Sequence, residues 1–138
     1  MKNNKLSTYF FAVGALFLII ACSVKKDKFI NRNFHAVTTE YNVLYNGNLA
    51  LDAGLEELKV TYQDNYWEVL PVERTTNKEQ NVLPGQSKNT NFDRAEEKAT
   101  KAIQKHSMNI GGTEKNPQMD EAYILLGKAR YYENRFLP

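Results

Sequence analysis

The 138-residue sequence has a single cysteine, Cys22, and only two histidines, His35 and His106. One cysteine cannot form a disulfide within the chain or a cluster of thiolate metal ligands. The histidines are about seventy positions apart, with no further ligand residues at metal-binding spacing around either, so we expect solvated or core side chains. The sequence therefore predicts no metal site and no cofactor.

A strong excess of charge of either sign is also missing: 18 lysines and arginines stand against 16 acidic residues, a formal net charge of +2. Proteins that bind nucleic acids use an extended field of basic side chains, so we expect no nucleic-acid partner. The sequence contains no glycine-rich phosphate loop, nucleophile elbow or His-Glu-x-x-His motif. Its adjacent acidic pairs point in different directions on predicted helices. The chain is therefore not expected to be an enzyme.

The longest apolar run, from Tyr9 to Ala21, has about 13 residues, fewer than the roughly 20 that a helix needs to cross a bilayer. It follows Lys2 and Lys5 and leads directly to Cys22, with a small residue before the cysteine and an aliphatic residue three places before it. This arrangement resembles the signal sequence of bacterial lipoproteins. The alternatives are a transmembrane anchor, or a secretory signal in which the cysteine occurs by chance.

The resemblance implies a lipoprotein signal peptide over residues 1–21, cleavage before Cys22 and acylation of that cysteine. Attachment to the membrane is then through acyl chains on Cys22, and two or more chains give stable anchoring. Residues 22–34 read as a short, charged, lipidated tether without helical periodicity. This tether is either a solvated linker or a segment that contacts anionic lipid head groups. The rest of the chain has the size of one small domain.

Apolar residues recur at steps of three and four over residues 35–66, which predicts two helices. Between them, Asn46-Gly47-Asn48 tolerates positive φ and predicts the end of one helix and the start of the next. Because this connection is short, residues 35–66 are expected to form an antiparallel helical hairpin. The apolar face of its second helix is formed by Leu51, Leu55, Leu58, Tyr62 and Tyr66.

Residues 67–91 are rich in Asn, Gln, Thr and Lys and contain Pro71, which predicts an extended linker that crosses between the helical parts. Trp67, Val69 and Leu70 are apolar exceptions within it and are expected to dock on another surface. One interpretation is that they cover the hydrophobic face of the hairpin. The other is that they dock in a groove of a partner protein.

Two further helices are predicted after the linker. The first carries a narrow stripe of mostly small side chains, which lets a neighbouring helix approach closely; the stripe is formed by Phe92, Ala95, Ala99, Ala102 and Ile103. The second, from about Asp120 to Glu133, has apolar side chains around most of its circumference. We expect this helix to be buried on two sides.

Residues 122–136 resemble the first helix and turn of a tetratricopeptide repeat, in which an aromatic residue precedes Leu-Gly and a second aromatic follows the turn. Tyr123, Leu126, Gly127 and Phe136 match this pattern. They are expected to pack neighbouring repeats, with Gly127 admitting the paired helix and Tyr123 and Leu126 filling the groove.

Residues 92–138 are therefore predicted to be the start of tetratricopeptide-like repeats, truncated at the end of this chain. Several repeats are needed to bury a continuous core, so the chain is expected to be the amino-terminal piece of a longer solenoid. The predicted fold class is all-α: helical hairpins of a tetratricopeptide-like solenoid, with a long extended crossing segment.

In their order along the chain, the lipoprotein signal, the helix end at Tyr41–Gly47, the Leu70-Pro71-Val72 segment and the late repeat-like helix resemble PorW/SprE-type lipoproteins. These belong to the type IX secretion and gliding machinery of Bacteroidota. The resemblance implies an outer-membrane lipoprotein on the periplasmic face, and basic residues after Cys22 agree with this. It implies a scaffold that binds protein components of the secretion and motility complex through helical repeats.

The alternative function is a nutrient-uptake lipoprotein that binds a glycan or a peptide with a helical-repeat fold. That function needs an exposed aromatic platform, for which Trp67, Tyr66 and Tyr62 are the candidates. The two functions differ in what the rest of the protein carries: many more repeats favour the scaffold, and a carbohydrate-binding part favours the receptor.

Overall fold

The computed structural model describes Tyr9, residues 23–76 and residues 89–136. Cys22, the predicted site of lipid attachment, and residues 77–88 of the predicted linker lie outside this part. The helices are α2 (Phe29–Thr38), the π-helix η1 (Thr39–Leu44), α3 (Tyr45–Thr61), α4 (Thr90–His106) and α5 (Met119–Tyr132). The strands β1 (Asn109–Ile110) and β2 (Thr113–Glu114) pair antiparallel.

The described part is mostly helical, which is compatible with the predicted all-α class. No helix within residues 23–76 and 89–136 has both the length and the apolar character needed to cross a membrane.

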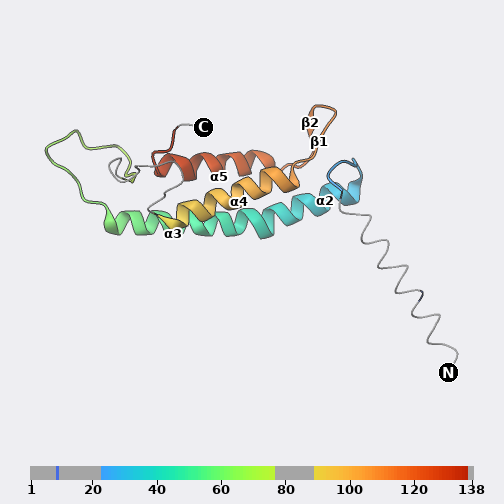
Figure 1. Ribbon diagram of the computed structural model, residues 1–138, viewed down its shortest axis with the longest axis horizontal. Coiled ribbons are helices and arrows are strands. Elements are labelled where there is room, and N and C mark those ends of the chain that lie inside the picture. The colour runs from blue at the N-terminus through green and yellow to red at the C-terminus, as the bar shows by residue number, and fades with distance from the viewer. Residues whose placement is uncertain (1–8, 10–22, 77–88, 137–138) are drawn as a thin grey trace, which may run out of the picture.

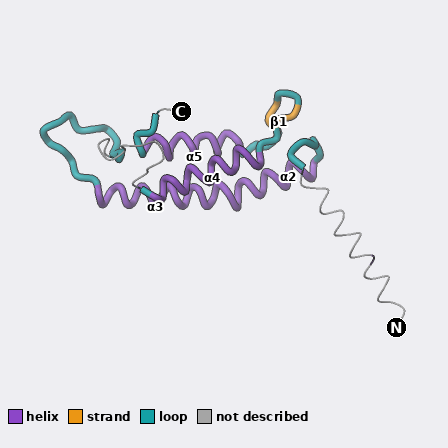
Figure 2. The backbone as a smooth tube through the Cα atoms, viewed as in Figure 1, coloured by secondary structure: helices purple, strands orange, loops and turns teal. Residues whose placement is uncertain are grey.

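Helices α2, η1 and α3 form one continuous rod from Phe29 to Thr61 (Figure 2). At both junctions, Thr39 and Leu44 keep right-handed helical φ and ψ. The predicted antiparallel hairpin over residues 35–66 is therefore wrong. The expectation of a tether without helix over residues 22–34 is wrong in its second half, because α2 begins at Phe29. The chain passes through Asn46-Gly47-Asn48 without turning, and the helix ends at Thr61 instead of continuing to residue 66.

Two buried glycines explain why the turn signal failed in this rod. A Cβ added at Gly47 would lie 2.6 Å from Cδ2 of Leu125, and a Cβ added at Gly54 would lie 2.7 Å from Cε1 of Phe92. Glycine is used here for the close approach of other helices and not for positive φ. Tertiary packing therefore overrides the local preference of Asn46-Gly47-Asn48 for a turn.

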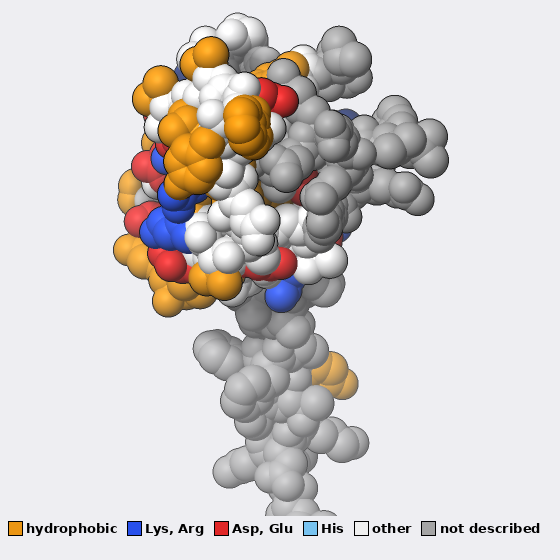
Figure 3. All heavy atoms as spheres, turned by 90° about the vertical axis from the view of Figure 1, so that its left-hand side faces the viewer, with side chains coloured by type: hydrophobic (Ala, Val, Ile, Leu, Met, Phe, Trp, Pro, Cys, Tyr) orange, Lys and Arg blue, Asp and Glu red, His pale blue; other side chains and the backbone are white. Residues whose placement is uncertain are grey.

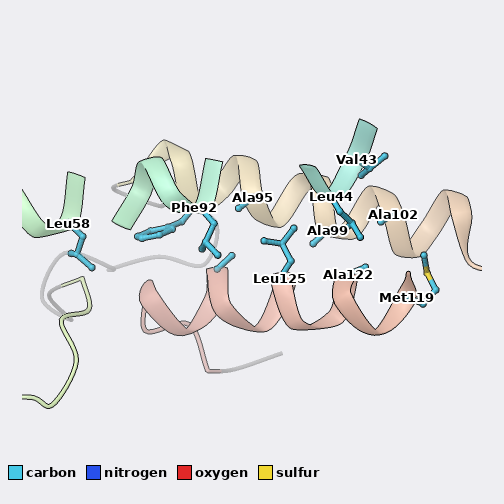
Figure 4. Packing of buried hydrophobic residues seen from close by; sticks show 12 residues of the cluster. Val43, Leu44, Leu58, Phe92, Ala95, Ala99, Ala102, Met119, Ala122 and Leu125 are labelled. Atoms are coloured by element: carbon cyan, nitrogen blue, oxygen red, sulfur yellow. The ribbon is translucent and has the colours of Figure 1, made fainter. Parts of the chain in front are cut away.

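Helix α4 lies between α3 and α5, and each of the three runs antiparallel to the next (Figure 1). Its predicted stripe of small residues is the centre of the core, since the side chains of Phe92, Ala95, Ala99 and Ala102 are fully buried. Leu125 reaches toward this stripe from α5 (Figure 4). α4 begins two residues before the predicted boundary, because the Asn89 side chain accepts a hydrogen bond from the Asn91 N–H at 3.0 Å and caps the helix.

A tight hairpin joins α4 to α5. Gly111 and Gly112 have φ of 63° and 77°, as the two-residue turn between β1 and β2 requires. The Glu114 carboxylate accepts hydrogen bonds from the Ser107 hydroxyl at 2.6 Å and from the Met108 N–H at 2.7 Å. Burial of Glu114 acts to raise its pKa, but these bonds outweigh it and the pKa is lowered. A charged carboxylate therefore fixes the loop after α4.

Candidate protein-interaction surfaces

Helix α5 buries one face, not the two that its composition predicts. The buried face packs on α4 and consists of Met119, Ala122, Leu125 and Ala129. Tyr123, Ile124 and Tyr131 are exposed on the other side, and Tyr123 keeps 59% of its surface accessible. The expectation of two-sided burial is wrong for the described chain, because no described element covers this second side.

We define the α5 outer face as Tyr123, Ile124, Gly127, Tyr131 and Phe136. A Cβ placed on Gly127 meets no atom within 4 Å, so nothing in the described structure packs against this glycine. The rings of Tyr131 and Phe136 meet edge to face, with centroids 6.2 Å apart. The face is therefore apolar and exposed within the described part of the chain.

The four residues predicted to pack neighbouring repeats do not share one environment in the structure. Leu126 is partly buried against the core formed with α4. Tyr123 and Phe136 are exposed, and Gly127 is open. The structure therefore places three of the four on the α5 outer face, while Leu126 is partly buried against the core.

The end of α5 holds the segment that follows α3. Asn134 has φ 57°, a left-handed conformation that ends the helix. Its side-chain amide donates to the hydroxyl oxygen of Thr75 at 3.0 Å and to the carbonyl of Thr76. The Thr76 N–H in turn donates to the carbonyl of Tyr132 at 2.8 Å. These bonds hold Thr75 and Thr76 of the crossing segment on the end of α5.

An ion-pair cluster reinforces the same region. Arg135 pairs with Glu96 of α4 and with the buried carboxylate of Glu133. Arg130 pairs with Glu96 at 3.0 Å. Because these pairs join the end of α5 to α4, they support the helix that presents the α5 outer face.

The crossing segment carries the second candidate surface, the Trp67 loop, which we define as residues 66–72. Trp67 and Val69 are each 97% exposed, and Leu70 is also exposed. Figure 3 views the molecule from the end that carries this loop, where hydrophobic side chains stand out in orange. The interpretation that these residues cover a hydrophobic face of their own helices is therefore wrong. Docking on a partner remains the open prediction for Trp67, Val69 and Leu70.

Short polar contacts shape the base of the Trp67 loop. The backbone N–H of Trp67 donates to Oδ1 of Asn65 at 3.1 Å. Arg74 pairs with Asp64 at 3.4 Å and lies over the ring of Tyr62, 5.6 Å from its centroid. The loop is thus held at its base, while its apolar side chains face outward.

Sequence reasoning missed one contact, a pair of histidines. Nδ1 of His35 on α2 lies 3.1 Å from Nδ1 of His106 at the end of α4. His35 is buried, and its Nε2 finds no hydrogen-bond partner among the described residues. One nitrogen of the contact must accept, so at least one ring is neutral.

The surroundings of the pair favour the neutral form of both rings. Burial lowers the pKa of His35, and burial, the neighbouring ring and the charges of Lys101 and Lys105 lower the pKa of His106. The described residues contain no group of three metal-binding side chains, so the pair lacks a third ligand. The histidines tie the start of the rod to the end of α4, and 71 residues of sequence separation hid this contact.

No protein-family model matches the chain, and no curated protein matches it significantly.

Proposed function

We propose that this protein is an outer-membrane-anchored scaffold lipoprotein that faces the periplasm and acts by protein–protein interaction through helical repeats. The single observation that supports this most is the α5 outer face, an ordered helical surface with exposed aromatic and aliphatic side chains. Exposed apolar patches on a folded domain commonly mark protein contacts. The repeat-like pattern around Leu126-Gly127 favours a further helix as the element that packs there.

The resemblance to PorW/SprE-type lipoproteins suggests the setting, the type IX secretion and gliding machinery. Acyl chains on Cys22 are the proposed membrane anchor. The Trp67 loop is the proposed second contact with protein components of that machinery, because a nearly fully exposed indole can bury a large apolar area on docking. No enzymatic role is proposed.

Quantitative co-purification tests the scaffold proposal. Tagged full-length protein from its native cells should enrich secretion-machinery components, and Ile124→Ala or Trp67→Ala should lower their recovery several-fold. Val60→Ala is the matched control, since Val60 is an exposed aliphatic residue on α3 outside both surfaces. Equal recovery with all three variants would refute the role of these surfaces.

Gly127→Ala tests the repeat contact more sharply. The added methyl meets no described atom, so the variant should fold at least as well as the wild type. If a further helix packs on Gly127, the same methyl obstructs it and lowers partner recovery. If Gly127→Ala recovered as much partner protein as the wild type does, that result would argue against repeat packing at this position.

Membrane fractionation tests the anchor separately. Cys22→Ala removes the proposed acylation site and should shift the protein out of the outer-membrane fraction. Mass spectrometry of the mature wild-type protein should find acyl chains on Cys22, and an unmodified cysteine would exclude lipid attachment there.

The alternative, a nutrient-uptake lipoprotein that binds a glycan or peptide, draws on the exposure of Trp67 and Tyr66. The aromatic contacts of the described residues include none between these two rings, and Tyr62 is covered by Arg74. The three side chains therefore do not form the flat platform that sugar stacking needs. Saturation-transfer NMR with oligosaccharides, with Trp67→Ala as the control, distinguishes this alternative.

A further inference from the structure

Helix α2 is amphipathic in the reverse sense of a normal surface helix. Its buried residues are polar, Asn31 and His35, while Phe29 remains 74% exposed and Ile30 and Val37 are exposed as well. Surface helices ordinarily bury their apolar side and expose their polar side. The apolar side of α2 is thus left for contact with something outside the described chain.

The inward polar side is satisfied within the protein, which fixes the orientation of the helix. Nδ2 of Asn31 donates to the carbonyl of Ser23 at 2.8 Å and to that of Lys26 at 3.2 Å. His35 meets His106, and the Thr39 hydroxyl donates to the His35 carbonyl at 2.6 Å. The bonds of Asn31 and Thr39 lie within residues 23–39 and would turn with the helix. Rotation of α2 to hide its apolar side would, however, break the contact between His35 and His106, so the exposure is part of the fold.

The exposed apolar residues continue along one side of the rod. We define the α2 stripe by its members, which recur at steps of three and four and are all exposed: Ile30, Phe34, Val37, Tyr41, Tyr45 and Leu49. Such steps place side chains on one helix face. Tyrosine suits a boundary between apolar and aqueous surroundings, because its ring is apolar and its hydroxyl is polar.

Basic residues lie at the beginning of this stripe. Lys25, Lys26 and Lys28 are exposed and form no ion pair within the described residues, whereas Arg32 pairs with Asp27 at 3.2 Å. Helix α2 itself contains no acidic residue. An apolar helix face beside unpaired lysines is the pattern of helices that lie on anionic membranes.

We propose that the α2 stripe and the adjacent lysines dock on the surface of an anionic lipid bilayer, with α2 lying in the interface. Charge complementarity and the position of α2 a few residues after Cys22 favour lipid over a protein as the occupant. The inference rests on the proposed lipid anchor for the second of these arguments and for which membrane is bound. The Trp67 loop lies at the opposite end of the molecule, away from α2 (Figure 1). Membrane contact at α2 therefore leaves that loop free.

Depth-dependent fluorescence quenching tests the proposal on the full-length chain. Phe34→Trp is introduced with Trp67→Phe, so that one indole reports, and Val37→Trp serves as a second reporter if the first perturbs the fold. The matched control is Val60→Trp, exposed at the far end of α3. Vesicles contain phosphatidylcholine, with or without phosphatidylglycerol, and brominated acyl chains.

In anionic vesicles, emission from the α2 reporters should shift to the blue and be quenched several-fold more strongly than emission from the control. Each Lys→Gln change among the three lysines should weaken docking by about fivefold. Equal quenching at Val60 and α2, or equal quenching with and without phosphatidylglycerol, would overturn the proposal. The vesicle measurements are made in a Cys22→Ala background, so a lack of quenching counts against α2 docking alone. An unmodified Cys22 in the native protein counts against the anchor alone, so the two failures are distinguishable.

Discussion

Alanine substitutions at Gly54 and Gly127 are the same chemical change in two helices, and the structure predicts opposite effects. An added Cβ at Gly54 would lie 2.7 Å from Cε1 and 2.8 Å from Cδ1 of Phe92. Phe92 is fully buried and stacks on Tyr132 with ring centroids 5.9 Å apart, so it has little room to move. At Gly127 the added Cβ meets nothing within 4 Å.

The magnitudes follow from two opposing terms. Alanine is favoured over glycine inside a helix by about 0.8–1 kcal/mol at both positions. At Gly54 this gain is opposed by overpacking, which costs about 1–3 kcal/mol in a well-packed core. We expect Gly54→Ala to lower the free energy of unfolding by about 1 kcal/mol and Gly127→Ala to raise it by about 1 kcal/mol. The two variants then differ by about 2 kcal/mol, more than tenfold in the folding equilibrium.

Urea unfolding followed by far-ultraviolet circular dichroism measures this difference. The slope of unfolding free energy against urea should be the same for both variants, so that the midpoints report stability. If Gly54→Ala were as stabilising as Gly127→Ala, the close approach of Phe92 to the rod would be refuted. If Gly127→Ala were destabilising, its outer face would not be open.

Three further predictions concern the histidine pair, the end of α5 and the core. Acidification from about pH 7.5 to about pH 5.5 should destabilise the fold, because histidines in the unfolded chain take up protons near the ordinary histidine pKa of 6.5, while His35 and His106 resist protonation. The double substitution of His35→Asn and His106→Asn should make the unfolding free energy depend less on pH. Urea unfolding at several pH values measures this, and an unchanged pH dependence would count against the pair. Asn134→Gly keeps the left-handed backbone but removes the two side-chain bonds to Thr75 and Thr76, so amide hydrogen exchange should accelerate in residues 73–76. Unchanged exchange would show that the Asn134 side chain does not hold this segment. Ala99→Leu should cost about 1–3 kcal/mol by overpacking between α3 and α5, and a wild-type urea midpoint would contradict that packing.

The sequence predicts α4 and α5 well because their signals are local and consistent. Small residues at steps of three and four, beginning at Phe92, predict a close helix contact, and the side chains of Ala95, Ala99 and Ala102 are buried. The sequence predicts two covered faces on α5, but the described structure covers one, because apolar composition does not reveal whether a neighbour is present. Only the structure shows that Tyr123 and Tyr131 are exposed.

The first half of the chain was harder to predict for physical reasons. Gly47 reads as a helix end, but its role is to admit Leu125 across the core. Val37, Tyr41 and Leu44 correctly predict helix, yet only Leu44 is buried. The contact between His35 and His106 depends on the complete fold, so neither residue type nor local spacing could predict it.

The π-helix η1 sets the rotational phase between the two halves of the rod. Each residue of an α-helix advances the side-chain direction by about 100°, whereas a π-turn accommodates an additional residue with little change in axis. Removal of one residue within Thr39–Leu44 would therefore turn α2 by about 100° relative to α3. His35 would swing away from His106 at the end of α4, while the bonds of Asn31 to Ser23 and Lys26 would turn with the helix. A single-residue deletion in η1 is thus enough to exchange the surface that α2 presents.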